Sequence, residues 1–234
     1  MKDTSFYNAE STAYSAKRYP ARAMTFTQYF FKERLARVNG VVQTYARTRG
    51  TPARLLEIGC ADGVVVRALW QKMPHAFSAI DAVDLSPDMV ATAAQNNADT
   101  PIRFMVRENA SLTPPYDVVL EVGVLNYTDL EADLRDAARL LDAHGIYLCS
   151  VAGASSLQNK IKGSSGYKHL LGYAQYEQEL RRYFTIRHAV PVGIFVPLLW
   201  RLPALARIVQ PWVEWAGRIS PNWALEKIYV LERR

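Results

Sequence analysis

The chain has 234 residues, of which 50% are apolar, enough to bury the core of one large domain. Its two cysteines, Cys60 and Cys149, lie far apart with no histidine at metal-ligand spacing, which argues against a disulfide framework or metal site and favours a reducing cytoplasm. The longest uncharged apolar stretch, residues 189–200, is shorter than the roughly 20 residues that a membrane-spanning helix requires. The polar first residues, with no apolar stretch behind them, predict no secretory signal.

The net charge of +6 is distributed unevenly along the chain. Residues 151–234 contain twelve Lys and Arg against five Glu and no Asp, whereas residues 1–150 contain sixteen basic and seventeen acidic residues. The basic excess of the last third would suit a phosphate-bearing acceptor or an anionic membrane leaflet.

Residues 1–50 predict an N-terminal helical cap. Residues 1–22, with Tyr14 and Tyr19, are too aromatic for a disordered tail, so we expect them to fold over the rest of the chain. From residue 24 to 49 apolar side chains recur at helical intervals, and Gly50-Thr51-Pro52 ends the pattern. This pattern predicts one long helix or two shorter ones.

Residues 51–190 and 224–234 alternate between strand-like and helix-like patterns. The predicted strands are residues 54–58, 79–84, 102–106, 117–122, 145–151, 184–190 and 227–232, and the predicted helices are 64–70, 87–97, 130–141 and 173–183. Strands separated by helices predict an α/β fold with a doubly wound, mostly parallel seven-stranded sheet and helices on both faces. Residues 152–172, rich in Ser, Gly and Lys, predict a loop.

Residues 191–223, between the last two predicted strands, form an insertion with five prolines and four of the five tryptophans. Its apolar bulk, Trp residues and sparse Arg residues suit the headgroup region of a bilayer or a groove for a hydrophobic acceptor. A helical lid packed on the domain and a dimer contact are the alternatives, and the pattern leaves all of them open.

The first predicted strand leads into a glycine-rich turn, with Glu57 at its end and Gly59 and Gly63 four residues apart. Such a turn at a helix start lets backbone amides approach a nucleotide-like ligand, because glycine has no Cβ and tolerates positive φ. The spacing differs from the Gly-x-Gly-x-x-Gly of nicotinamide and flavin sites. The second strand ends in Asp84, whose carboxylate can accept both hydroxyls of a ribose.

These strand ends resemble motifs of the class I S-adenosylmethionine-dependent methyltransferases, which have a Rossmann-like fold. Residues 57–63 are similar to the family's first motif and residues 83–87 to its second. Residues 104–110 resemble its third strand and adenine-contacting turn. Residues 116–127 and 140–148 resemble the fourth motif and the helix-Gly-strand unit that follows it. The resemblance covers roughly residues 54–151.

The resemblance implies S-adenosylmethionine as cofactor, with S-adenosylhomocysteine as product. It assigns cofactor binding to Glu57, Gly59, Cys60, Ala61, Gly63, Asp84, Leu85, Asn109, Ala110 and Glu121. Asn109 stands where the family often has Asp, and its amide can still bond an adenine amino group. Cys60 lines the cofactor without chemistry of its own. Tyr14 is expected either to close over the cofactor or to pack in the core.

Three residues are candidates for catalysis. Glu121, at the end of the fourth strand, could act as a base, hold the methionine ammonium group, or attract the cationic cofactor. His169, in the loop after the fifth strand, could deprotonate a hydroxyl, or could be an ordinary exposed histidine. Tyr127 follows Glu121 in the fourth motif. Methyl transfer itself needs little beyond alignment of the reactants.

The acceptor is the open question. We expect a small-molecule or lipid-linked acceptor, such as a glycan, quinone-type compound or lipid, methylated on oxygen or nitrogen, in the cytoplasm or at the inner face of the membrane. An RNA or DNA methyltransferase is the alternative suggested by the basic last third, but its tryptophans lie among Pro and Leu rather than between Lys and Arg. A protein that binds the cofactor without turnover is a further alternative. The oligomeric state is left open.

Overall fold

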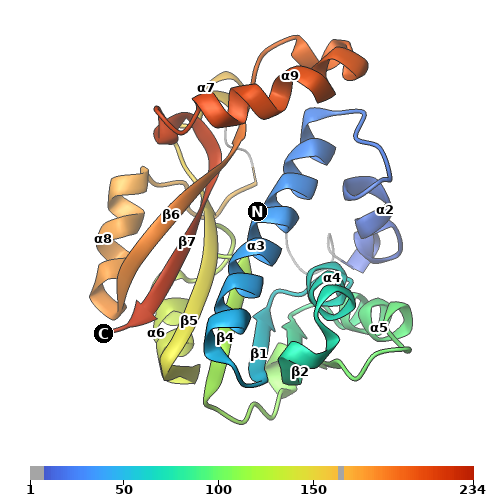
Figure 1. The fold of residues 1–234 in the computed structure, drawn as a ribbon, viewed down its shortest axis with the longest axis vertical. Helices are drawn as coiled ribbons and strands as arrows, with labels where there is room; N and C mark the ends of the chain where they lie inside the picture. The colour runs from blue at the N-terminus through green and yellow to red at the C-terminus, as the bar shows by residue number, and fades with distance from the viewer. Residues whose placement is uncertain (1–7, 163–165) are drawn as a thin grey trace.

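The computed structural model describes residues 8–162 and 166–234 (Figure 1). Residues 1–7 of the predicted cap and 163–165 of the predicted loop lie outside the described residues. The helices of the described chain are α2 (Tyr14–Arg18), α3 (Phe26–Arg49), α4 (Val64–Lys72), α5 (Pro87–Asn96), α6 (Leu130–Leu140), α7 (Leu157–Lys162), α8 (Tyr173–Tyr183) and α9 (Pro203–Ala216). The strands are β1 (Ala53–Ile58), β2 (Phe77–Asp84), β3 (Arg103–Val106), β4 (Tyr116–Val122), β5 (Leu141–Ala152), β6 (Phe184–Ile194) and β7 (Ala224–Arg233).

The seven strands form one sheet in the order β3-β2-β1-β4-β5-β7-β6. The first five strands are parallel, whereas β7 runs antiparallel to both β5 and β6. The strand order reverses between β1 and β4, and in open α/β sheets ligands bind at the carboxyl ends of the strands at this point. The predicted doubly wound, mostly parallel seven-stranded sheet is therefore confirmed.

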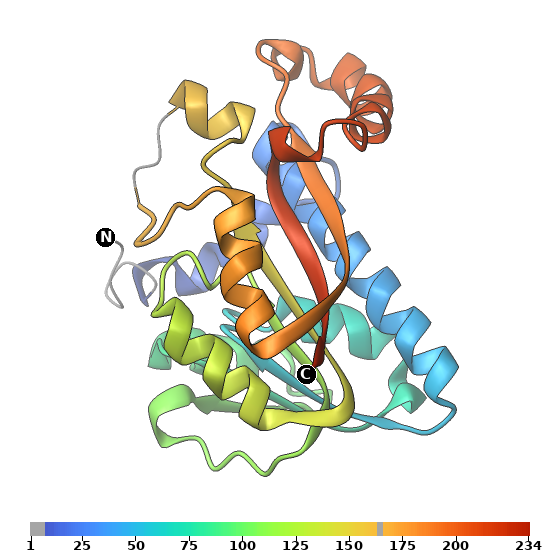
Figure 2. The same ribbon diagram turned by 90° about the vertical axis from the view of Figure 1, so that its left-hand side faces the viewer.

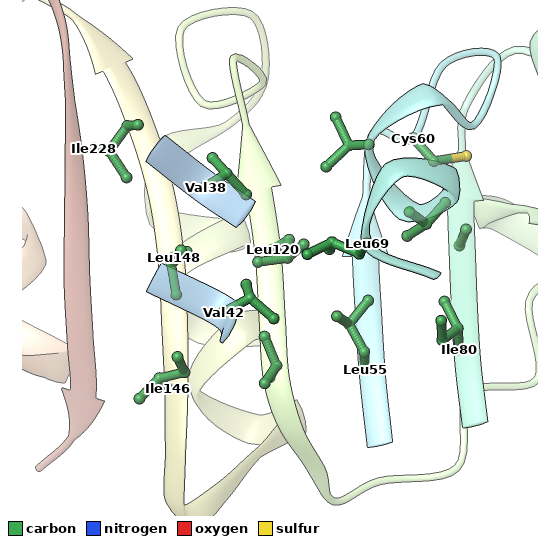
Figure 3. Packing of buried hydrophobic residues seen from close by; sticks show 14 of the residues in the cluster. Val38, Val42, Leu55, Cys60, Leu69, Ile80, Leu120, Ile146, Leu148 and Ile228 are labelled. Atoms are coloured by element: carbon green, nitrogen blue, oxygen red, sulfur yellow. The ribbon is translucent and has the colours of Figure 1, made fainter. Parts of the chain in front are cut away.

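Helices cover both faces of the sheet, because the central strands carry apolar residues toward both sides. Leu55 of β1 belongs to the core beneath α3 and α4, which also holds Val38 and Leu69 (Figure 3). Leu56, the next residue, belongs to the core on the opposite face, beneath α6 and α8. Figure 2 shows α6 and α8 together on this second face.

The N-terminal cap contains one long helix, α3, preceded by the short α2. Thr25 caps the start of α3, where its side chain accepts a hydrogen bond from the amide of Gln28, and Gly50 ends the helix with φ +73°. The apolar face of α3 packs on the sheet through Phe30, Val38 and Val42, which are buried. Of the two arrangements that the sequence allows here, the protein adopts the single helix.

Several boundaries differ from the sequence-based expectation; β5, for example, begins at Leu141 rather than at residue 145. The strand predicted over 184–190 continues to Ile194, so the first residues of the predicted insertion belong to β6, and Pro191 pairs with Lys227. A proline fits there because β6 is the edge strand, where a missing amide hydrogen costs no pairing on the open side. The predicted loop 152–172 contains the short helix α7. None of the helices in the described ranges is long and apolar enough to cross a bilayer.

Candidate active site

The turn between β1 and α4 is built from residues with left-handed backbone conformations. Gly59, Ala61 and Gly63 have φ of +76°, +48° and +81°. A Cβ on Gly59 would lie 2.3 Å from Cγ2 of Val124, and one on Gly63 would lie 2.6 Å from Nδ2 of Asn97. The turn is thus shaped both by conformation and by close packing, and only glycine satisfies both conditions at these two positions.

Asp84, at the end of β2, lies beside this turn. Its Oδ2 accepts the amide of Ala61 at 2.9 Å, and its Oδ1 accepts the amide of Ser86 at 2.9 Å. Burial raises the pKa of the Asp84 carboxyl, and these backbone hydrogen bonds oppose that rise. Each carboxylate oxygen keeps a second lone pair, so the group is oriented and still able to accept hydroxyls of a ligand.

Acidic side chains gather around the turn. Glu57 is buried, and burial raises its pKa to about 8, while a hydrogen bond from the backbone of Val66 lowers it. Oε2 of Glu57 and Oδ1 of Asp62 are buried oxygens without a hydrogen-bond partner in the described chain. Together with Asp84 these acids disfavour an anionic guest such as a dinucleotide pyrophosphate. They fit S-adenosylmethionine, which carries a sulfonium and an ammonium group.

The segment before α3 folds over the same turn. The amide of Ser15, in α2, donates to Oδ2 of Asp62 at 3.0 Å, and the hydroxyl of Ser86 donates to Oδ1 of Asn8. Tyr14 is half-buried next to Ser15, with the Arg18 guanidinium stacked 3.9 Å from its ring centroid. The segment therefore bridges the ends of β1 and β2.

The other predicted cofactor residues lie at the same edge of the sheet. Leu85 is exposed after β2, and Asn109 and Ala110 follow β3 through a short 3-10 helix, with Asn109 exposed. Cys60 is buried, and burial raises the pKa of its thiol well above the usual range, so it is a poor nucleophile. The site roles of all these residues stay predictions.

A cavity of about 420 Å³ lies between the N-terminal helices, the loop after β4 and the start of β7. Its described lining consists of Glu10, Tyr14, Lys17, Arg18, Thr27, Phe30, Phe31, Arg34, Gly123, Tyr127, Gln158, Tyr167, Leu225 and Glu226. Aromatic rings supply flat walls, and Tyr127 and Tyr167 pack with ring centroids 5.3 Å apart. Cationic side chains outnumber acids in this lining by three to two.

A buried hydrogen-bond chain forms one wall of the cavity. The amide of Gly123 donates to Oγ of Ser150 at 2.8 Å, and the Ser150 hydroxyl donates to Oε2 of Glu226 at 2.8 Å. Arg34 donates to both oxygens of Glu226 through Nη1, at 3.1 and 3.2 Å. Gly123 has φ +74°, and a Cβ there would lie 2.5 Å from Nη1 of Arg34. The end of β4 is thereby held against α3 and β7.

The three catalytic candidates occupy different places. Tyr127 lines the cavity. Glu121 instead points toward the α6 side of the sheet, where it accepts the hydroxyl of Tyr147 at 2.7 Å, and burial raises its pKa to about 8. Nε2 of His169 lies 2.9 Å from the carbonyl oxygen of Thr128. Of these candidates the structure brings only Tyr127 to the cavity, and the roles of Glu121 and His169 stay predictions.

Several lining residues were not singled out by the sequence. Arg34 and Glu226 are 192 residues apart, and nothing local signals that they pair. Asp62, which does not line the cavity, is a buried residue of the glycine turn that the sequence analysis also left out, although its place between the two glycines is a signal for a ligand contact. Arg18 lies in the N-terminal segment that we expected to fold over the rest of the chain, and Tyr167 lies in the predicted loop 152–172.

Comparison with known proteins supports the family assignment. Residues 56–147 match the family model described as Methyltransferase domain. The chain is 27% identical over 148 residues to malonyl-[acyl-carrier protein] O-methyltransferase of Bacillus anthracis, covering 61% of this chain and 54% of that protein. It is 33% identical over 111 residues to the same enzyme of Halalkalibacterium halodurans, covering 44% and 40% of the two chains. The chain thus spans about half the length of the curated relatives it matches.

Solved structures agree on the fold. Magnesium protoporphyrin IX methyltransferase of Synechocystis, with bound S-adenosylhomocysteine, superposes with a TM-score of 0.69 at 18% identity, covering 99% of this chain and 98% of that one. The N-methyltransferase NodS of Bradyrhizobium japonicum gives 0.65 at 14% identity, covering 99% of both chains. Residues 56–147 therefore match a methyltransferase domain, and the sheet order and the acid-flanked glycine turn give the chain the fold of the class I S-adenosylmethionine-dependent methyltransferases, as the sequence motifs predicted.

Proposed function

We propose that this protein transfers a methyl group from S-adenosylmethionine to a small-molecule or lipid-linked acceptor that enters the cavity between the N-terminal helices and the loop after β4. The observation that carries the proposal is the turn itself, in which Gly59 and Gly63 bring the backbone close to a ligand and Glu57, Asp62 and Asp84 surround it with acids. S-adenosylmethionine, when bound, supplies an electrophilic methyl group on a positively charged sulfur.

In this proposal each part of the chain has a separate task. Asp84 holds the ribose hydroxyls, and the unpartnered oxygens of Glu57 and Asp62 accept hydrogen bonds from the ammonium end of the cofactor. The amide edge of Asn109 and the apolar surfaces of Leu85 and Ala110 hold the adenine. The helix α2 segment with Tyr14 excludes water from the reacting centre.

The lining of the cavity favours an acceptor whose nucleophilic atom does not have to be deprotonated before methyl transfer. Its two carboxylates are both paired with arginines, Glu10 with Arg18 and Glu226 with Arg34. Burial raises the pKa of Tyr167 to about 12, so this hydroxyl stays protonated near neutral pH and does not serve as a base. A carboxylate acceptor needs no general base. Lys17 and Arg18 both pair with Glu10, so these three groups leave one positive charge that would attract such an acceptor. Relatives named as O-methyltransferases of malonyl-acyl carrier protein support this acceptor class.

A lipid-linked acceptor is the second candidate within the same reaction. Leu225 and Glu226 line the cavity at the start of β7, directly after the segment 191–223 with its exposed apolar side chains. We also propose that the protein works in the cytoplasm or at the inner face of the membrane. The thiols of Cys60 and Cys149, both free and buried, fit a reducing compartment.

Calorimetry with S-adenosylmethionine and S-adenosylhomocysteine tests the first step. We expect both to bind, and Asp84→Ala to lower the affinity by about 30-fold or more, because two charge-assisted hydrogen bonds are lost. Transfer of a labelled methyl group to carboxylic acids, acyl carrier protein conjugates, lipids, quinones, glycans and RNA then identifies the acceptor. Absence of cofactor binding would refute the proposal, and binding without transfer to any class would leave a non-catalytic binding protein.

A further inference from the structure

Helix α9 presents its apolar side chains to solvent and its polar side chains to the protein. Its buried residues are Ala206, Gln210 and Glu214, which follow one another at intervals of four. Its exposed large residues are Leu205, Ile208, Trp212 and Trp215, with exposed fractions of 49%, 68%, 71% and 63%. At 3.6 residues per turn the two sets lie on opposite sides of the helix. An ordinary surface helix has the reverse arrangement.

The orientation of α9 is held by hydrogen bonds to the end of β6. Glu214 accepts the amides of Gly193 and Ile194 at 3.1 and 2.9 Å. Gln210 donates to the carbonyl of Ile194 at 2.6 Å and to Oε1 of Glu214 at 3.0 Å. These bonds satisfy buried backbone groups, so turning α9 over would leave them unpaired. The hydrogen bonds of Gln210 and Glu214 therefore fix the orientation of α9 that exposes its apolar face.

The exposed face continues beyond α9 on both sides. Leu198 and Leu202 precede the helix, and Ile219 and Trp223 follow it, all more than half exposed. We call this set, with Leu205, Ile208, Trp212 and Trp215, the α9 apolar face. Figures 1 and 2 both place α9 at one end of the molecule, beyond the last residue of β6 and the first of β7. Ala152, at the carboxyl end of β5, pairs with Glu226 near the start of β7, so this is also the edge that holds the cavity.

Charge identifies the partner that fits this face. Residues 191–223 contain three arginines, Arg201, Arg207 and Arg218, and one acid, Glu214, which is buried. Arg201 and Arg218 are exposed, one on each side of the helix in sequence. Indole rings prefer the boundary between headgroups and acyl chains, and arginine is attracted to anionic headgroups.

We infer that the α9 apolar face inserts into the headgroup region of an anionic lipid bilayer, with Arg201 and Arg218 contacting the lipid phosphates. A contact between two copies of this face fits less well. A two-fold interface would bring the same arginines together without an exposed acid of residues 191–223 to pair with them. A lid closed on the domain is not formed by this face, because the polar side of α9 is the side that packs. The inference goes beyond the proposed methyl transfer and does not depend on it.

Vesicle flotation of the full chain tests this inference. We expect the protein to bind vesicles of phosphatidylcholine with about 30% phosphatidylglycerol at least tenfold more tightly than vesicles of phosphatidylcholine alone. The triple variant I208S/W212S/W215S should lose binding by about 100-fold, because the inserted apolar area is removed. Since these side chains are exposed, its thermal unfolding temperature should equal that of the parent chain.

A charge variant and its matched control separate a contact made by the arginines beside α9 from a general electrostatic attraction of the basic protein to anionic vesicles. R201Q/R218Q should weaken binding to the anionic vesicles by about tenfold. R182Q/R187Q removes the same charge from α8 and the start of β6, where both arginines pair with glutamates, and should leave binding unchanged. If the triple variant does not fold, the comparison of R201Q/R218Q with R182Q/R187Q alone decides the inference.

Two results would overturn the inference. One is equal binding of the parent and triple variant to anionic vesicles, which would show a contact elsewhere on the molecule. The other is a parent chain that is dimeric by light scattering, does not bind the vesicles, and becomes monomeric in the triple variant. That outcome would assign the α9 apolar face to a contact between copies of the chain.

Discussion

Arg34 of α3 and Glu226 of β7 form a buried ion pair, with Nη1 3.1 Å from Oε1, at the wall of the candidate acceptor cavity. The pair joins the N-terminal helix to the last strand, and Ser150 extends it by a hydrogen bond to Glu226. The amide of Gly123, at the end of β4, donates in turn to Ser150. Four separate segments therefore depend on one charged pair for the shape of the cavity.

Arg34→Met should lower the free energy of unfolding by about 3–5 kcal/mol, because it leaves the Glu226 carboxylate buried without its partner. Urea denaturation measures this loss. On the same helix, Arg37 pairs with Glu33 at a partly exposed i,i+4 position, so Arg37→Met should cost about 0.5 kcal/mol or less. Equal effects of the two substitutions would contradict the assigned importance of the buried pair.

Gly63→Ala should destabilise the protein by about 1–3 kcal/mol, because it forces alanine into a left-handed conformation and against Asn97 and Phe104. We expect a parallel loss of S-adenosylmethionine affinity in calorimetry. Gly40→Ala is the matched control, since Gly40 is an exposed residue inside α3 where an added Cβ would meet no atom within 4 Å. This control should raise stability by about 0.5–1 kcal/mol. A neutral Gly63→Ala variant would show that the turn tolerates a side chain.

The buried Glu121 predicts a pH dependence of stability. Burial raises its pKa from 4.5 to about 8, so between these values the folded protein binds a proton that the unfolded chain releases. The free energy of unfolding should therefore fall as pH rises through this window. Glu121→Gln removes the ionisation while its amide oxygen still accepts the Tyr147 hydroxyl.

Relative to the parent chain, Glu121→Gln should gain stability between about pH 5 and pH 8, by an amount on the order of a few kcal/mol. Urea denaturation at a series of pH values measures the difference. Glu131→Gln, at the exposed start of α6, should show no such trend. A difference for Glu121→Gln that does not vary with pH would mean that this carboxyl does not titrate in the window.

Asn126→Ala should cost about 2–4 kcal/mol, because the Asn126 side chain joins the loops after β4 and β5. Its Oδ1 accepts the amide of Ala152, and its Nδ2 donates to the carbonyls of Ala152 and His169 and to the Tyr176 hydroxyl. Tyr127, the next residue, lines the cavity, so acceptor KM should rise more than the Kd of the cofactor. Equal changes in the two constants would show that the loss is general unfolding.

The local elements of this protein are determined by its sequence. Alternating apolar runs and helical intervals predict the seven strands, and glycines at 59 and 63 with acids at 57 and 84 predict the family, because these signals act within a few residues of one another. The mostly parallel sheet follows from the same alternation, since parallel strands need helical crossovers, whereas the order of the strands is known only from the structure.

Contacts between distant segments were decided only by the tertiary structure. No local signal pairs Arg34 with Glu226 or brings Ser15 to Asp62, because such pairs form only when the helices dock on the sheet. The orientation of α9 is the clearest case. Its sequence contains one apolar and one polar face, and periodicity alone would bury the apolar one. The polar face is buried instead, because the amides of Gly193 and Ile194 at the end of the edge strand require acceptors that Glu214 provides.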